Sequence, residues 1–587
     1  MAGGVSRTYG LIFYDKGKWT IPEVEPHVAI RLKGLFPKIS LSSRAPFSFK
    51  DTLDFCEDMT WFMWRYPLEI SDKDRRRMAK QRRLFEKNIA ELEAILLPDT
   101  SFPSSEKEFP GLKEGKAPRD YQIKTVKVLE RVKTLICADD LGLGKTFTGM
   151  TATLMPHMRP AAVVVETHLP DQWMEKYKEF TDLRVHFVKN GKPYPLPSAD
   201  VYIFKYSTLA NWVDVFSTGF FKTAIYDEVQ NLRTGTSSNK GSAAASLSAD
   251  AEYNMGMSHT PMFNYANEIW NIYNILSPGV LGTRDEFARE WGDYWGSSSD
   301  KIIVKDPRAL GAYLRENYLM IKNTREMVGR ELLPVERVVH EIDHDETLVK
   351  DYVALAKKLS KTVLYSSDFQ QSGAASRELE QVTRQMTGIS KARSVANFVK
   401  ILLESGEAVI LAGWHREVYR IWLEELDEYN PMMFTGSESP KQKEINKQAF
   451  LAGESNLLIM SLRSGAGTDG LQERGRCIVF GEADWAAGVY EQLEGRLHRD
   501  GQDGNVMSFY LFSTFGSDPV MRETLGLKAS QARGITMPDS GPIKRARSRD
   551  SIKQIAGQIL GEIDTEKVAT PKDRKTTATT TEQPTLF

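Results

Sequence analysis

The segment CADDLGLGKT (residues 137–146) constrains the fold more than any other part of the chain. The apolar run TLI precedes it and FTGMTATLM follows it, so its glycines are expected in a turn between a buried strand and a helix. In such a turn, Gly142 and Gly144 let backbone N–H groups surround a phosphate at the positive end of the helix. Lys145 would reach the β- and γ-phosphates of a nucleotide, and the Thr146 hydroxyl would hold Mg²⁺. The sequence therefore predicts an α/β fold with a nucleotide site at this turn.

Two further pairs of residues fit the same site. Asp227 and Glu228 end the predicted strand in TAIYDEVQ, about eighty residues past the phosphate loop, where open parallel sheets place their ligands. Asp227 would complete the Mg²⁺ shell through water, and Glu228 would orient or deprotonate the attacking water. Tyr121 and Gln122 precede Lys145 by just over twenty residues, where an aromatic ring could stack on adenine and an amide could read its edge. Together these residues predict ATP hydrolysis with Mg²⁺.

The composition excludes several classes of protein. Lys and Arg total 77 against 78 Asp and Glu, so a nucleic-acid site must be a local cluster of basic residues. The three cysteines are far apart and have no metal-ligand spacing, which indicates reduced core thiols in a cytosolic protein. The N-terminus lacks an apolar signal core, and no run approaches roughly 18 apolar residues, so neither secretion nor a membrane span is expected.

Residues 1–105 are expected to form a separate α+β accessory module. Its aromatic-rich stretch, residues 51–70, is interpreted as core packing. A long helix is predicted from residue 72 to 97, and a basic row lies about 200° round that helix from its apolar stripe. This row could follow a DNA backbone, with an ordinary solvated face as the alternative. The row comprises Arg76, Lys80, Arg83 and Lys87.

The elements MSHTPMFN and QLEGRLHRDGQ follow in order after DDLGLGKT and YDEVQ. Together they resemble the Swi/Snf motors of helicase superfamily two, which are DNA-translocating ATPases, over roughly residues 118–530. The resemblance implies two RecA-like parallel-sheet lobes with helical insertions that clamp ATP and move along duplex DNA. The stretch 383–418 resembles the annealing-helicase branch. Two departures are visible, because Val229 and Gln230 replace the usual Ala-His, and His259 stands where the family has a Gly that could adopt a positive φ.

The same resemblance implies roles for further residues. Arg496 and Arg499 are three apart in a predicted helix and would be arginine fingers that reach the γ-phosphate when the lobes close. Ser258, Thr260 and Asn264 would couple the two lobes and the DNA to the nucleotide; the alternative is an ordinary hydrophilic turn. The segment 310–332 is expected to be helical. Lys322 and Arg325 on it could contact DNA phosphates, with ordinary solvent-facing helix charges as the default expectation. The remaining candidate nucleotide contacts are Asp140, Leu143, Gly467, Asp469 and Gln492, and the remaining candidate DNA contacts are Lys322, Arg325 and Gln472.

Four parts are therefore expected along the chain. They are the accessory module (1–105), lobe 1 with a helical protrusion (106–334), lobe 2 with a helical insertion (335–530), and a basic, partly helical and then disordered tail (531–587). The final QPTLF resembles the peptide with which bacterial replication proteins bind the sliding clamp, with coincidence as the alternative. In that peptide the contacts would be made by Gln583, Leu586 and Phe587.

The sequence thus predicts an ATP-driven translocase on double-stranded DNA, in the cytosol of a bacterium or a phage-infected bacterium, that acts in replication, repair or recombination. A conventional superfamily-two helicase acting on DNA or RNA is the first alternative. A non-catalytic nucleic-acid scaffold is the second, and it is disfavoured because Lys145, Thr146, the acidic pair and both arginines are present.

Overall fold

The structure is a computed structural model and describes most of the chain. The described residues are 7–40, 42–104, 107–262, 266–293, 302–330, 332–462, 468–537 and 551–561. Within these ranges no helix combines the length and the apolar character that crossing a bilayer requires. The three cysteines are all buried as free thiols.

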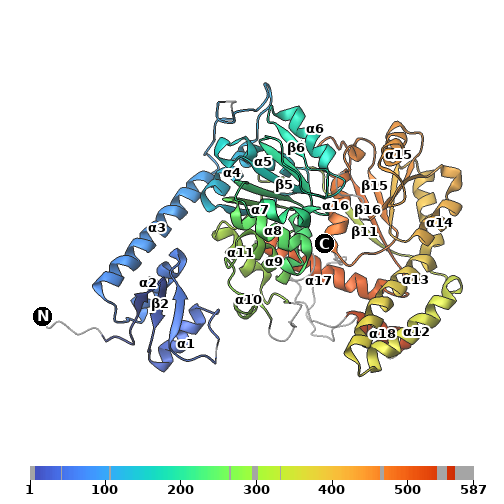
Figure 1. The fold of residues 1–587 in the computed structure, drawn as a ribbon. Coiled ribbons are helices and arrows are strands. Elements are labelled where there is room, and N and C mark those ends of the chain that lie inside the picture. Colours follow the sequence, from blue (N-terminus) through green and yellow to red (C-terminus); the bar gives the residue numbers. More distant parts are fainter. Residues whose placement is uncertain are drawn as a thin grey trace, which may run out of the picture.

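A three-stranded antiparallel sheet and two helices make the N-terminal module, and a third helix connects it to lobe 1 (Figure 1). The strands are β1 (Phe13–Asp15), β2 (Lys18–Ile21) and β3 (Phe47–Lys50), and the helices are α1 (Pro26–Leu35), α2 (Leu53–Arg65) and α3 (Asp72–Leu96). Trp19 and Phe55 are buried in the core of the module. Along α3, Met78 packs in this core, whereas Leu92 packs in the core of lobe 1. One helix therefore belongs to both units.

Seven parallel strands in the order β10-β4-β9-β8-β5-β7-β6 form the sheet of lobe 1. Apolar runs such as AAVVV in β5 are buried, as expected for strands covered by helices on both faces. Helices α4, α5 and α6 pack on one face, and α8 and α9 on the other. The strands are β4 (Thr134–Cys137), β5 (Ala161–Val165), β6 (Val185–Phe187), β7 (Val201–Lys205), β8 (Thr223–Asp227), β9 (Tyr253–Met257) and β10 (Met320–Ile321). The helices are α4 (Asp120–Val132), α5 (Lys145–Leu154), α6 (Pro170–Phe180), α7 (Val213–Phe216), α8 (Asn239–Asp250), α9 (Ala266–Leu276), α10 (Arg284–Trp291) and α11 (Pro307–Glu316).

The edge strand β10 corrects a prediction, because the segment 310–332 was expected to be helical. Helix α11 ends at Glu316, Tyr318 takes a φ of 53°, and the chain then pairs in parallel with β4. Met320 is buried against the lobe 1 core. The reason is tertiary: the apolar run LMI completes the sheet edge, and this pairing outweighs the local helical pattern.

Lobe 2 has six parallel strands in the order β11-β16-β15-β12-β14-β13. Helices α13 and α14 pack on one face of its sheet, and α15 and α16 on the other. The strands are β11 (Glu336–Glu341), β12 (Val409–Gly413), β13 (Met432–Phe434), β14 (Leu457–Ser461), β15 (Cys477–Phe480) and β16 (Met507–Phe512). The helices are α12 (Lys350–Tyr365), α13 (Phe369–Glu404), α14 (Arg416–Glu425), α15 (Pro440–Ala452), α16 (Ala487–Leu497), α17 (Asp518–Thr536) and α18 (Ser551–Leu560). The two parallel-sheet lobes, their helical insertions and the N-terminal antiparallel sheet confirm the predicted fold class.

The C-terminal helices connect the two lobes. Helix α17 leaves lobe 2 after β16 and packs against α11 of lobe 1, where Ile535 enters the lobe 1 core. The approach is close, because a Cβ on Gly311 would lie 2.3 Å from the Ile535 carbonyl oxygen. Helix α18 packs on α12 and α13 of lobe 2. The predicted lobe boundary at residue 530 therefore falls inside α17.

Candidate nucleotide site between the two lobes

The phosphate loop connects β4 to α5 as predicted, and its two glycines have the backbone that the loop needs. Gly142 and Gly144 have φ angles of 78° and 77°, a region that side chains with a Cβ rarely occupy. A Cβ on Gly142 would also lie 2.1 Å from Nη2 of Arg325. Leu143 between them is buried, and Thr146 follows half-buried in the first turn of α5. The loop thus presents the start of α5 to a ligand, as anion sites at helix N-termini do.

Lys145 lies inside the loop and contacts its backbone. Its Nζ donates to the carbonyl oxygens of Asp139 at 2.7 Å and Asp140 at 3.2 Å. Burial lowers the pKa of Lys145. Asp139 stands where the strict pattern has Gly, and the structure gives it a bracing role, because its Oδ1 accepts from N and Nδ2 of Asn323, both at 2.8 Å. The carboxylate ties the loop to the segment after β10.

Tyr121 and Gln122 hold the loop from the side of α4. The Tyr121 hydroxyl donates to the Leu143 carbonyl oxygen at 2.6 Å. Nε2 of Gln122 lies 3.3 Å from the carbonyl oxygens of both Leu143 and Gly144. The structure therefore places both residues beside the loop, and their predicted contact with adenine stays a prediction.

The acidic pair lies at the carboxyl end of β8. Asp227 accepts a hydrogen bond from Nε1 of Trp173 at 3.0 Å. Glu228 has φ 49° and ψ 59°, a left-handed conformation that costs a non-glycine residue of order 1–3 kcal/mol and is found mostly at functional sites. Gln230 donates to Glu228 at 2.5 Å, and Gln492 of lobe 2 donates to it at 3.4 Å. The Gln that replaces the family His therefore orients the carboxylate.

Burial and the charge of Glu228 raise the pKa of Asp227 to about 7. The ionised carboxylate therefore destabilises the ligand-free fold: the penalty grows as pH rises from the unfolded pKa near 3.8 and is fully present above the folded pKa near 7. Asp227→Asn should raise the melting temperature without Mg²⁺ or nucleotide, and the gain should be larger at pH 8 than at pH 5. Each pKa unit corresponds to about 1.4 kcal/mol. An equal shift at both pH values, measured by thermal denaturation in a chelator, would contradict the ionisation argument.

Both predicted arginine fingers contact one carboxylate of lobe 2. Arg496 lies in α16, but α16 ends at Leu497, so Arg499 lies beyond the helix and the predicted shared helical face is wrong. Nη1 of Arg496 is 3.5 Å from Oδ1 of Asp469, and Arg499 pairs with the same oxygen. Gln172 of lobe 1 donates to the other Asp469 oxygen at 2.7 Å. Asp469 thus joins the arginines to lobe 1.

The arginines also face the catalytic groups of lobe 1. Asp227 and Glu228 are among the charges that act on Arg496, whose pKa is lowered by burial. Among the described residues, none accepts a hydrogen bond from the buried Nε of Arg496. The Cβ of Arg499 lies 3.4 Å from where a Cβ of Gly142 would stand. The phosphate loop and the acidic pair of lobe 1 and the two arginines of lobe 2 therefore surround one site.

His259 spans the two lobes at this site. Its Nδ1 lies 3.8 Å from Oδ1 of Asp140 in the phosphate loop, and its Nε2 lies 3.5 Å from Oε2 of Glu491 in α16. Burial and the nearby Lys322 lower the pKa of His259, while Glu491 opposes this shift. His259 is not among the described residues with positive φ, so the backbone tolerates the replacement of Gly.

Lys322 and Arg325 lie at the nucleotide site rather than on an exposed helix. Both residues are buried, each with only 8% of its surface exposed. Nζ of Lys322 pairs with Oδ1 of Asp140 at 2.8 Å. Arg325 donates Nη2 to the Leu141 carbonyl oxygen at 2.9 Å and pairs with Asp500 of lobe 2 at 3.1 Å. The expectation of solvent-facing charges was wrong, and a DNA contact in another conformation stays a prediction.

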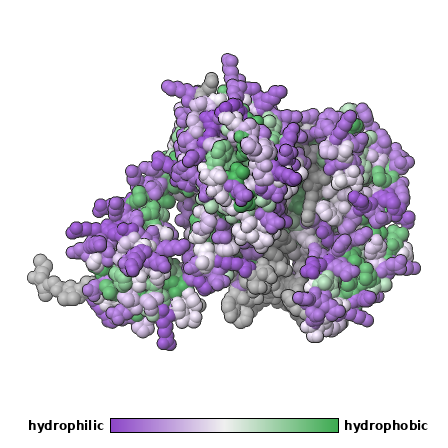
Figure 2. Space-filling model, in the orientation of Figure 1, coloured by the Kyte–Doolittle hydropathy of each residue, from purple (hydrophilic) through white to green (hydrophobic). Residues whose placement is uncertain are grey.

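The other candidate DNA contacts lie in three separate places: after β9, in lobe 2 and on α3. Ser258 and Thr260 are buried after β9, where the Ser258 Oγ accepts from the Thr260 backbone N–H at 3.0 Å. Gln472 is half-buried in a short 3₁₀ helix of lobe 2 (Leu471–Glu473). Asn264 and Gly467 lie outside the described residues. The α3 row is exposed as predicted, and Figure 2 shows mostly hydrophilic residues along this helix. Its members are Arg76, Lys80, Arg83 and Lys87.

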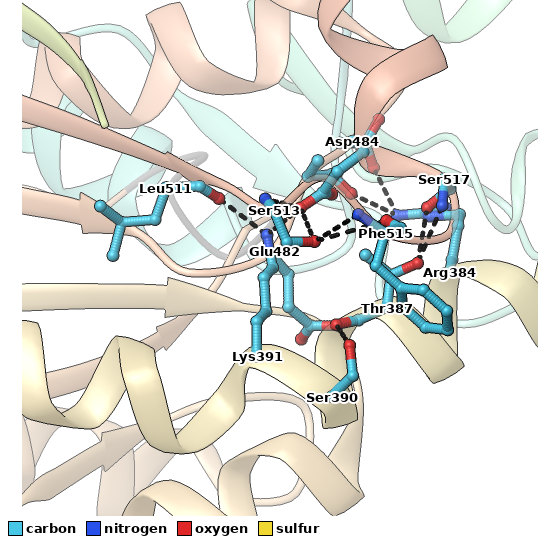
Figure 3. A network of polar contacts seen from close by, with 12 residues as sticks. Arg384, Thr387, Ser390, Lys391, Glu482, Asp484, Leu511, Ser513, Phe515 and Ser517 are labelled. Carbon is cyan, nitrogen blue, oxygen red and sulfur yellow. Dashed lines mark hydrogen bonds and ion pairs between the residues drawn. The ribbon is translucent and has the colours of Figure 1, made fainter. Parts of the chain in front are cut away.

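A buried polar network in lobe 2 supports the arginine-bearing helix (Figure 3). Lys391 of α13 pairs with Asp518 at 2.8 Å, and both side chains are buried. About two helical turns earlier in α13, Arg384 contacts Asp484 at 3.4 Å. Asp484 in turn accepts from the backbone N–H of Ala486, the residue before α16. The helical insertion is thus linked directly to the start of α16, and a broken pair of this kind would leave a costly buried charge.

Several of these residues escaped sequence analysis. Trp173, Asn323 and Glu491 belong to none of the motifs above, and Asp500 lies inside QLEGRLHRDGQ but was given no role. Folding brings all four to the site. Two sequence features could have pointed to them: Asp139 in place of the Gly of the strict phosphate-loop pattern, and the several acidic residues in and around α16.

The family model of the SNF2-related domain matches residues 73–403, which is more than half of the chain. The chain belongs to the SNF2-related family. Membership of this family implies the use of ATP.

The SNF2-related relatives are distant in sequence. An uncharacterized ATP-dependent helicase of Bacillus subtilis is 24% identical over 431 residues, covering 66% of this chain and 74% of the relative. The SWI/SNF-related matrix-associated actin-dependent regulator of chromatin subfamily A-like protein 1 of Xenopus tropicalis is 24% identical over 424 residues, covering 68% and 42%. An uncharacterized ATP-dependent helicase of Mycoplasma pneumoniae is 19% identical, covering 67% and 40%. The chain therefore spans about two fifths of the Xenopus and Mycoplasma relatives.

Among solved structures, the Sulfolobus solfataricus SWI2/SNF2 ATPase core in complex with dsDNA matches 74% of this chain and 96% of that chain. The sequence identity is 18% and the TM-score is 0.36. A second structure, the Sulfolobus solfataricus SWI2/SNF2 ATPase core domain, matches 80% of this chain and 98% of that chain at 18% identity and a TM-score of 0.34.

Proposed function

We propose that this SNF2-related chain is a DNA-dependent ATPase that moves on double-stranded DNA. One observation carries the proposal: the phosphate loop, the acidic pair of lobe 1 and two arginines of lobe 2 surround the same site. Lys145 would bind the β- and γ-phosphates, and Glu228 would orient the attacking water and accept its proton. Arg496 and Arg499 would neutralise the charge that develops on the γ-phosphoryl group.

The residues of the site fit a nucleotide with Mg²⁺. The two left-handed glycines open the loop to phosphate oxygens, and Lys145 contacts carbonyl groups that a phosphate could replace as its partner. Thr146 and Asp227 would hold Mg²⁺, which neutralises phosphate charge when bound. The raised pKa of Asp227 fits a carboxylate whose ionisation a bound cation would favour. The donors are the oxygen ligands that Mg²⁺ prefers.

Lobe closure would control hydrolysis in this proposal. Asp469 pairs with both arginines here, so the γ-phosphate would compete with Asp469 for them. His259 and Glu491 contact each other across the same boundary, as do Arg325 and Asp500. Changes at the nucleotide would therefore alter several contacts between the lobes at once, which is how a hydrolysis step can become a relative movement.

The test is the ATP hydrolysis rate measured at one salt concentration with no nucleic acid, single-stranded DNA, duplex DNA, branched DNA and RNA. Stimulation by duplex or branched DNA is expected. Stimulation by RNA or single strands alone would favour the conventional helicase. No hydrolysis under any condition would favour a non-catalytic scaffold and overturn the proposal.

Within this proposal, we place the chain nearest the annealing-helicase branch and in a bacterial or phage-infected cytosol. The segment resemblance at 383–418 and the helicase relatives from bacteria support this placement. Replication, repair and recombination are the processes in which such a motor would act. A strand-annealing assay on a partly melted duplex tests the branch, because a conventional helicase would separate the strands instead.

We also propose that the QPTLF peptide binds a bacterial sliding clamp, on the sequence resemblance alone, because residues 562–587 lie outside those described. Replacing Leu586 and Phe587 with alanine in the full chain should weaken clamp binding roughly tenfold or more, since such apolar anchors carry most of a peptide's affinity. Purified clamp and fluorescence anisotropy would measure the effect. Thr585→Ala is the matched control, because it changes a position that the Q-x-x-L-F pattern leaves open. Equal affinities for both variants would end the idea.

A further inference from the structure

Two tryptophans on α2 are exposed although the aromatic-rich segment was expected to form core. Trp61 is 59% exposed and Trp64 is 71% exposed. The opposite face of the helix does build the core, through Phe55 and Phe62. Because residues three apart lie on the same side of a helix, the two indoles are neighbours. Large apolar side chains exposed together point to an interaction surface.

The surface beside the tryptophans is strongly basic. Helix α3 packs against α2, and the guanidinium of Arg82 lies 5.6 Å from the centre of the Trp64 ring. Arg82 also pairs with Glu57 of α2 and with Glu86 of α3, both at 2.9 Å, and Arg77 pairs with Asp51, so these two arginines are already neutralised. From Lys73 to Lys87, α3 carries eight basic and two acidic side chains. Asp54 and Asp58 add acidic charge on α2, so the positive potential is concentrated on α3.

This combination of rings and charge favours nucleic acid with unpaired bases as the partner. Aromatic side chains bind single strands by stacking on successive bases, while basic side chains follow the phosphates. Bases inside a duplex are already stacked on one another, so an indole could stack on them only after the base steps are pulled apart, which costs a few kcal/mol per step. A protein partner is disfavoured. Protein interfaces are enriched in Trp and Arg but depleted of Lys, whereas the helix beside these rings carries Lys73, Lys80 and Lys87.

We propose that the N-terminal module binds single-stranded DNA, with Trp61 and Trp64 stacked on unpaired bases and the basic half of α3 on the adjoining phosphates. The choice of DNA over RNA rests on the proposed function. Because α3 continues into the core of lobe 1 at Leu92, a strand held by the module would stay at a fixed place relative to the motor. The ligand would then be a duplex with an unpaired arm, such as a fork.

The test is binding of the full chain, without ATP, to a dye-labelled oligothymidine about 20 nucleotides long, which several stacking and phosphate contacts can occupy. The double variant Trp61→Ala/Trp64→Ala should bind it roughly tenfold or more weakly and bind a blunt duplex with unchanged affinity. Replacing both tryptophans with Phe should retain most of the binding, because a ring remains. Ile30→Ala is the matched control, since Ile30 is 69% exposed in the same module and has no ring.

Several outcomes would overturn the proposal. The first is an alanine double variant that binds oligothymidine with wild-type affinity, or that loses as much affinity for the blunt duplex as for oligothymidine. The second is tighter binding of oligouridine than of oligothymidine by the parent chain. The third is polyglutamate that displaces the labelled oligothymidine as well as unlabelled oligothymidine does, which would indicate an acidic protein partner. Unchanged melting temperatures would show that the variants fold. Because no ATP is used, a chain that binds oligothymidine through its tryptophans but never hydrolyses ATP would overturn the motor and leave this site standing.

Discussion

Lys145→Ala should reduce ATP turnover by a factor of roughly 10² to 10³ or more, the usual cost of losing one positioned group that stabilises the transition state. The side chain is the cation of the phosphate loop, and its Nζ already points at the loop carbonyls of Asp139 and Asp140. Burial lowers the pKa of this amine, so the folded protein holds the charge at some cost to stability. The variant should therefore fold at least as well as the parent chain while losing phosphate binding.

The matched control for this change is Lys178→Ala, which removes an exposed lysine from α6 of the same lobe. The control should keep the parent rate. Glu228→Gln should lose turnover as Lys145→Ala does, but it should still bind ATP, because the phosphate loop is intact. If Lys145→Ala and Lys178→Ala hydrolyse ATP equally fast, the nucleotide site lies elsewhere. A fluorescent nucleotide analogue separates the loss of binding from the loss of chemistry.

The parts of the site that sequence could predict are those with a local signature. The buried run of β4 leads through the phosphate loop to Lys145 at the start of α5, and the buried run of β8 ends in Asp227, followed by Glu228. Each of these signals, the apolar run of a strand, the glycine pattern of the loop and the carboxylate at a strand end, can be recognised within a segment of about ten residues. The fold class followed from the same strands, because repeated buried runs separated by helices give parallel sheets.

Other features depend on contacts that no local pattern encodes. Gln172 meets Asp469 across 297 positions, and Arg325 meets Asp500 across 175. These pairs exist only because the lobes dock. Lys322 and Arg325 also contact the distant phosphate loop within lobe 1, so neither could be recognised as buried from its helix-like local sequence. The tryptophans of α2 illustrate the same limit within one helix, since aromatic content predicts a core but does not say which rings face it.

Replacing either arginine of lobe 2 should cause the second large loss of ATP turnover. Arg496→Ala and Arg499→Ala should each lower the DNA-stimulated turnover by roughly 10³ to 10⁵, the range measured for arginine fingers in related phosphoryl transfer. Both guanidinium groups pair with Asp469, and Asp227 and Glu228 lie among the charges that act on Arg496. ATP binding to lobe 1 should survive, because Lys145 and the loop are untouched.

Arg476→Ala is the matched control, because Arg476 is a lobe 2 arginine in an exposed ion pair with Asp503, and such pairs contribute little to stability. Arg499→Lys separates charge from shape: a lysine keeps the charge but cannot donate from a planar fork, so only partial rescue is expected. Single-turnover hydrolysis with saturating ATP and duplex DNA measures the chemical step itself. Parent rates in both finger variants would mean that lobe 2 closes without contributing to chemistry, and the arginines would then serve only to hold Asp469 against Gln172 of lobe 1.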